Sequence, residues 1–90
     1  MSNEEIKYSP PYILYVDKQG RITPDSVKML RYRFEIRKMN RSKIIKYYGL
    51  LECSAQFYNW IAGHRGVKKH LKKWSKALID SGAIDEVKRI

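Results

Sequence analysis

The residues best suited to chemistry in this 90-residue sequence are basic, and they crowd between positions 64 and 76. No acidic residue interrupts them before Asp80. Lysines spaced four apart on a helix repel one another. A negatively charged partner is therefore expected to offset this repulsion. Lysine and arginine at this density typically neutralise phosphates. The candidate nucleic-acid-binding residues are His64, Arg65, Lys68, Lys69, Lys72, Lys73 and Lys76.

A second basic cluster precedes this one, and the whole chain has a net charge of +10. Such a balance predicts a polyanionic partner, and less readily an anionic membrane surface. Between Asp25 and residue 46, Glu35 is the one acidic residue, so salt bridges within the cluster cannot balance it. The members taken as a secondary basic patch are Arg33, Arg37, Lys38, Arg41 and Lys43.

Catalysis and metal binding have little support in the sequence. It has no Ser–His–acid set, no glycine-rich phosphate loop and no carboxylate pair in an apolar setting. The lone Cys53 cannot form an intramolecular disulfide, and with His64 and His70 it lacks the spacing of zinc ligands. We expect no enzyme, no metal and no cofactor, with a small basic ribonuclease as the catalytic alternative.

The basic residues between 65 and 76 require a helix with an apolar face to hold them. Apolar residues recur at i, i+4, i+7 and i+11, which predicts a helix over 66–81. These core positions are Val67, Leu71, Trp74 and Leu78. Gly63 is a suitable end for a preceding helix over 55–62. A short helix, a glycine turn and a longer basic helix form the helix-turn-helix pattern.

The remainder of the chain predicts one domain over 1–90, mainly α with a small β element and about four helices. Residues 12–16 suit a strand, and residues 17–23 suit a turn with a short return arm. Helices are expected over 24–40 and 43–51, the second capped by Ser42, and Ser54 is expected to cap the helix over 55–62. The C-terminal strand, within 83–90, is expected to pair with the N-terminal hairpin, because both have unpaired backbone groups.

The sequence Val67-Lys68-Lys69-His70-Leu71-Lys72-Lys73-Trp74 resembles the recognition helix of small bacterial and archaeal winged helix-turn-helix repressors. In that family a V-x-x-H-L-x-x-L rhythm precedes a glycine and a short strand, and Gly82 fits this continuation. The resemblance covers 54–90. Here Trp74 replaces the usual leucine, and the segment after residue 84 is too short for a full wing hairpin. The resemblance implies a DNA-contacting helix over 66–81. Arg65 and Lys69, near the start of that helix, are the best candidates for base edges, because the N-terminal residues of a recognition helix reach deepest into the major groove.

An alternative placement of the motif lies one helix earlier. Ile45, Gly49 and Leu50 are similar to the first helix and turn of many repressors, which would make the helix over 55–62 the recognition helix. That helix is almost uncharged, whereas a helix in the major groove needs cations for phosphates. The basic helix is therefore the favoured placement.

These observations predict a DNA-binding protein, most simply a cytoplasmic transcriptional regulator that binds double-stranded DNA as a homodimer. A structural RNA-binding protein, such as a small ribosomal protein, is the alternative, and the second basic cluster supports it. A viral protein that binds a host nucleoprotein complex is a further alternative. No apolar run reaches the length of a membrane span, so we expect no membrane partner.

Overall fold

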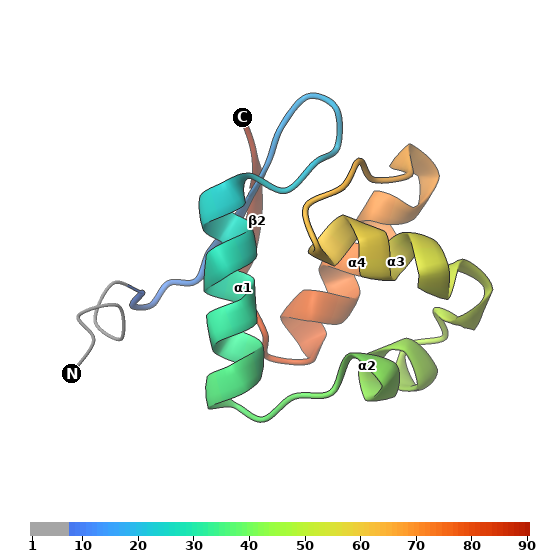
Figure 1. Cartoon of the computed structure of the whole chain (residues 1–90), viewed down its shortest axis with the longest axis horizontal. Coiled ribbons are helices and arrows are strands. Elements are labelled where there is room, and N and C mark those ends of the chain that lie inside the picture. The colour runs from blue at the N-terminus through green and yellow to red at the C-terminus, as the bar shows by residue number, and fades with distance from the viewer. Residues whose placement is uncertain (1–7) are drawn as a thin grey trace.

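The structure, a computed structural model, describes residues 8–90 and shows a mainly helical chain with a small sheet (Figure 1). The expected fold class is therefore confirmed. In chain order the elements are β1 (Ile13–Val16), α1 (Pro24–Ile36), α2 (Arg41–Tyr47), the 3-10 turn η2 (Leu51–Cys53), α3 (Ser54–Ile61), α4 (Lys68–Asp80) and β2 (Glu86–Arg89).

The two strands bring the two ends of the described chain together. β1 and β2 are parallel, in a register that runs from Ile13 opposite Glu86 to Val16 opposite Arg89. The predicted pairing of the C-terminal segment with the N-terminal strand is thus confirmed. The return arm of the expected hairpin is reduced to one antiparallel bridge between Val16 and Ile22.

Helix α1 begins where the sequence predicts but ends earlier. Its first residue is Pro24, whose missing N–H costs nothing at a helix start. Its last residue is Ile36, so the predicted end at residue 40 is wrong. Lys38 takes a positive φ of 51°, and the Met39 N–H donates to the carbonyl of Phe34 at 2.8 Å. This left-handed turn satisfies the last helix carbonyls without a glycine.

Helices α2 and α3 are capped differently from the prediction. The Asn40 side chain accepts the Ser42 N–H at 2.8 Å, so Asn40 rather than Ser42 caps α2. The helix stops at Tyr47, before Gly49 with its φ of 70°. Ser54 is the first residue of α3 and makes no cap, because the η2 turn already leads into the helix. Gly63, with φ of 101°, ends α3 as predicted.

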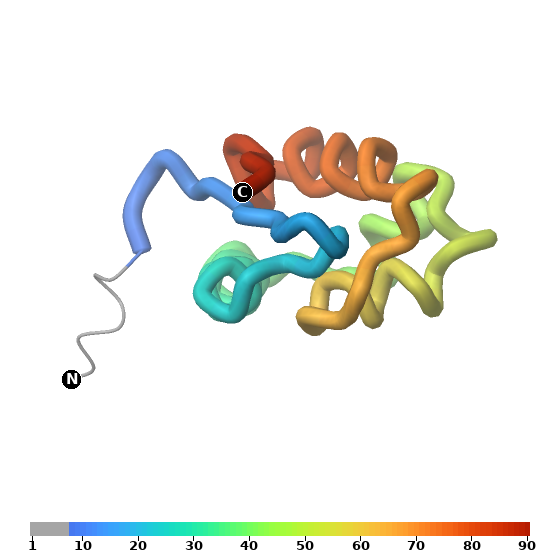
Figure 2. Tube along the Cα trace, turned by 90° about the horizontal axis from the view of Figure 1, so that it is seen from above, coloured from blue at the N-terminus to red at the C-terminus, as the bar shows by residue number. Residues whose placement is uncertain are grey.

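The centre of the core lies between α3 and α4. Trp60 and Trp74 have ring centroids 5.3 Å apart, and Phe57 packs edge-on to Trp74 at 5.9 Å. The Trp74 Nε1–H donates to Cys53 Sγ at 3.2 Å, and Cys53 is buried. Because the buried faces of α3 and α4 meet, their exposed faces point away from each other. Figure 2 shows α4 on one side of the molecule and α3 and α1 on the other.

Candidate nucleic-acid interface

Helix α4 carries its cations on the face opposite the core. Leu71, Trp74, Ala77 and Leu78 are buried, whereas its lysines are all exposed. The exposed lysines are Lys68, Lys69, Lys72, Lys73 and Lys76. Within residues 8–90 the one salt bridge joins Lys76 Nζ to Asp80 at 3.7 Å, and the Lys76 side chain is still 77% exposed. The remaining lysines of α4 thus have no acidic partner in the described part of the chain.

The predicted apolar face of this helix is confirmed, with one adjustment. Val67 is half-buried and stands just before the first residue of α4, and the helix begins at Lys68 rather than at residue 66. His70 is half-buried and its ring lies 5.4 Å from that of Trp74, tilted by 32°. His70 is therefore a packing residue at the edge of the core.

A backbone junction fixes the loop before α4 against the turn after β1. The Gly66 N–H donates to the carbonyl of Gly20 at 3.1 Å, and the Trp60 Nε1–H donates to the same oxygen at 3.0 Å. A Cβ atom on Gly66 would lie 2.6 Å from Leu71 and 2.7 Å from both Gly20 and Trp60. No side chain fits there, so this close approach of two loops requires glycine.

This junction places cations from three parts of the chain around one cleft. The cleft has a volume of about 480 Å³, and its basic lining residues are Lys18, Arg65, Lys68 and Arg89. Asp17 also lines it. One oxygen of the Asp17 carboxylate accepts the backbone N–H groups of Gln19 and Arg21, each at 2.9 Å, which ties it to its own turn. Four cations therefore face one carboxylate that already has two donors.

A second cleft, of about 380 Å³, continues along α4 toward its C-terminal end. Val16, Leu71 and Arg89 line both clefts, so the two form one groove between α4 and the sheet. The lining of the second part is largely apolar, and Lys72 and Lys76 belong to it. We call this feature the basic groove and define it by Lys18, Arg65, Lys68, Lys72, Lys76 and Arg89.

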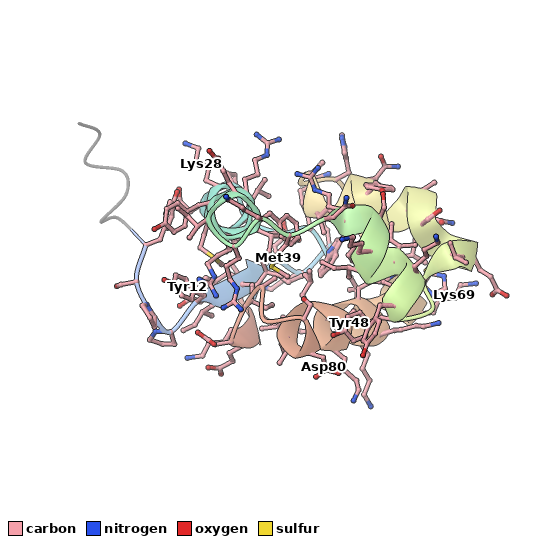
Figure 3. The ribbon with its side chains drawn as sticks, turned by 90° about the horizontal axis from the view of Figure 1, so that it is seen from below. Tyr12, Lys28, Met39, Tyr48, Lys69 and Asp80 are labelled. Carbon is pink, nitrogen blue, oxygen red and sulfur yellow. The ribbon has the colours of Figure 1, made fainter. Side chains whose placement is uncertain are left out.

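Two members of the basic groove, Lys18 and Arg89, are absent from the residues singled out by sequence. Lys18 lies far from α4 in the chain and Arg89 lies on β2, the element after α4; the parallel pairing of β1 with β2 sets both beside the helix. The long-range pairing was predictable, but the side of α4 on which the sheet lies was not. His64, Lys69 and Lys73 are exposed and do not line the groove. Figure 3 shows Lys69 at the end of the molecule farthest from Tyr12.

The structure divides the secondary basic patch. Arg33 is half-buried, with Nε and Nη2 donating to the carbonyls of Ala83 and Gly82 at 3.1 and 3.0 Å. Its guanidinium also lies 3.8 Å above the ring of Tyr12. Arg33 therefore joins α1 to the segment before β2 and is a structural residue. Four exposed members remain at the junction of α1 and α2, namely Arg37, Lys38, Arg41 and Lys43.

The alternative recognition helix, α3, presents a polar and uncharged surface. Ala55, Gln56, Tyr58 and Asn59 are exposed, and the Tyr58 hydroxyl lies 3.0 Å from Ser42 Oγ of α2. Amide side chains such as those of Gln56 and Asn59 can pair with adenine. Because the exposed faces of α3 and α4 point in opposite directions, one straight duplex cannot lie against both.

The fold changes the ionisation of Tyr48. Partial burial, followed by the charges of Asp80 and Tyr47, raises the pKa of Tyr48 above its ordinary value of 10.0. Tyr48 and Asp80 lie side by side where α2 meets the end of α4 (Figure 3). They lie outside the basic groove, so this shift concerns the stability of the fold.

Other kinds of site find no support in the described part of the chain. No three residues of the types that bind metals gather there. None of its helices is both long and apolar enough to cross a membrane. Comparisons of this chain with models of known families, with characterised proteins and with solved structures find no match.

Proposed function

We propose that this chain binds double-stranded DNA through α4 and the basic groove beside it, as a transcriptional regulator. The observation that carries the proposal is the convergence of six cations along one groove, one of them on the turn after β1 and one on β2. The resemblance of α4 to winged helix-turn-helix recognition helices supports the same partner. A major groove about 12 Å wide admits an α-helix, and cations beside the helix then reach the phosphates.

The positions of the cations suggest their roles. Lys18, Arg65, Lys68 and Arg89 surround one cleft at the start of α4, which suits them to a phosphate rather than to base edges. Lys69 and Lys73 are exposed on α4 outside the groove, which makes Lys69 the better candidate for a base edge. Arg65, expected from the sequence to reach a base, is accordingly proposed here as a phosphate contact.

Structured RNA is the second candidate, and the exposed basic residues at the α1–α2 junction are what favour it. A folded RNA can contact several surfaces of a small protein at once, whereas a straight duplex contacts one. A competition experiment separates the two partners: a labelled DNA duplex is displaced by unlabelled duplex, hairpin RNA or single strands at near-physiological salt. We expect duplex DNA to be the strongest competitor. Stronger competition by hairpin RNA would favour the second candidate.

Matched variants identify the helix that makes the contact. Lys69→Ala with Lys73→Ala removes two exposed side chains from α4, and Gln56→Ala with Asn59→Ala removes two from α3. The α4 pair should weaken binding to a preferred duplex on the order of tenfold, because loss of a base-edge contact costs about 1–3 kcal/mol. The α3 pair should leave it unchanged. The reverse outcome would make α3 the recognition helix.

A further inference from the structure

Strand β2 has an open edge. Glu86 and Ile90 donate their N–H groups toward β1, to the carbonyls of Tyr12 at 3.4 Å and Val16 at 3.0 Å. Backbone groups alternate in direction along a strand, so the N–H and C=O groups of Val87 and Arg89 point away from β1. The sheet has two strands, and within residues 8–90 nothing pairs with this outer edge. Unpaired strand edges can bind a further strand.

The charges along this edge are complementary to themselves. In an antiparallel pair of identical strands centred on Val87, Glu86 of each copy stands opposite Lys88 of the other copy. In the same register Asp85 stands opposite Arg89. Val87 is also the residue whose outward N–H and C=O groups can exchange both hydrogen bonds with the same residue of the second copy. Glu86 and Lys88 of each copy therefore face opposite charges, whereas the Asp85 carboxylate already accepts the Tyr12 N–H at 2.8 Å and Arg89 lines the basic groove.

We infer that β2 pairs antiparallel with β2 of a second copy of this chain, centred on Val87, and that the two sheets join into one. Charged residues on edge strands often serve to prevent such pairing. Here they disfavour other arrangements, because parallel pairing in register would place Glu86 opposite Glu86 and Lys88 opposite Lys88. Opposite charges directly across a strand pair are favourable and like charges are unfavourable.

Apolar surface beside the edge supports the same occupant. Val87, at the centre of the pairing, is half-buried against the core. Ile90, at 63% exposure, lies just beyond the strand. A second copy would cover part of this surface. The paired strands are short, so the dimer should be weak and reversible.

The symmetry of this dimer has a consequence for binding, which rests on the proposed function. A two-fold axis relating adjacent antiparallel strands is normal to the sheet, so α4 of both copies lies on the same face. The side chains of Val87 and Arg89 face α4, as the lining of the groove shows. The dimer would therefore present two basic helices to one side, as paired half-sites on a duplex require.

Charge exchange tests the interface without nucleic acid. Glu86 and Lys88 are both exposed, so changing them should leave the fold intact. In sedimentation equilibrium, Glu86→Lys alone and Lys88→Glu alone should each weaken the dimer on the order of tenfold, because each creates two like-charge pairs. The double variant Glu86→Lys/Lys88→Glu should restore wild-type association. An equimolar mixture of the two single variants should form heterodimers.

Amide exchange supplies the second measurement. Protection of the Val87 and Arg89 amides should rise with protein concentration in the wild type and not in either single variant. Single variants that associate as well as wild type, or a double variant that fails to restore association, would overturn the inference. So would a wild type that stays monomeric at every accessible concentration. None of these outcomes changes the expected binding of DNA by a single copy, so the two proposals can fail separately.

Discussion

Gly66 donates its backbone N–H to the carbonyl oxygen of Gly20 at 3.1 Å, and this bond joins the loop that carries Arg65 to the turn that carries Lys18. Trp60 donates its indole N–H to the same oxygen, so the core and both loops meet at one acceptor. The cleft at the start of α4 therefore depends on two glycines that touch, in addition to the cations that line it.

The first prediction concerns Gly66. Gly66→Ala introduces a Cβ atom 2.6–2.7 Å from its neighbours, so the two loops must separate. The free energy of unfolding, measured with urea, should fall by about 1–3 kcal/mol because the site is overpacked. Gln19→Ala, on the exposed side of the facing turn, is the control and should change it by less than about 0.5 kcal/mol. Equal stability of Gly66→Ala and wild type would show that the loops do not meet as described.

The second prediction separates Arg33 from the binding surface. Arg33→Lys removes the planar guanidinium group, which donates to two backbone carbonyls and stacks on the ring of Tyr12. It should lower the free energy of unfolding by about 1–3 kcal/mol, as expected for hydrogen bonds from a charged group. The control Arg37→Lys, at an exposed position, should leave stability unchanged. A stable Arg33→Lys variant with weakened duplex binding would return Arg33 to the interface.

The third prediction concerns alkaline pH. Because the pKa of Tyr48 is raised above 10.0 in the fold, the unfolded chain releases this phenol proton at lower pH than the native protein does. Above the unfolded pKa the unfolded chain then binds fewer protons, so stability falls as pH rises through about 10. Tyr48→Phe should make this fall in the free energy of unfolding shallower, measured by urea unfolding at successive pH values. An identical fall in Tyr48→Phe would contradict the shift.

The sequence predicted the features that depend on the helical spacing of apolar residues and on the positions of glycines. The buried set Leu71, Trp74 and Leu78 follows directly from helical spacing, and Gly63 ends α3 as its position indicated. The pairing of the C-terminal segment with β1 was predictable because both needed hydrogen-bond partners. These inferences required no knowledge of tertiary packing.

Other features depended on contacts that the sequence does not display. α1 ends early because Lys38 takes a left-handed conformation without being glycine, and Asn40 then supplies the cap. Arg33 looked like its basic neighbours, but its side chain reaches carbonyls about fifty residues away in the chain. Lys18 and Arg89 enter the groove through the sheet, which sets them beside α4. The charge pattern of the sequence thus identified the basic residues of α4, and tertiary packing determined which basic residues line the groove.

The salt dependence of duplex binding tests the central proposal most directly. Lys68→Gln with Lys72→Gln removes two charges from the basic groove, and Lys28→Gln with Lys46→Gln removes two from exposed positions on α1 and α2. Both double variants have the same net charge. For the groove pair, the slope of log affinity against log salt should become shallower by about 1.8, which is about 0.9 for each lost phosphate contact. For the other pair, the slope should stay near the wild-type value. Equal changes in the two variants, or an unchanged slope for the groove pair, would contradict binding of DNA along α4.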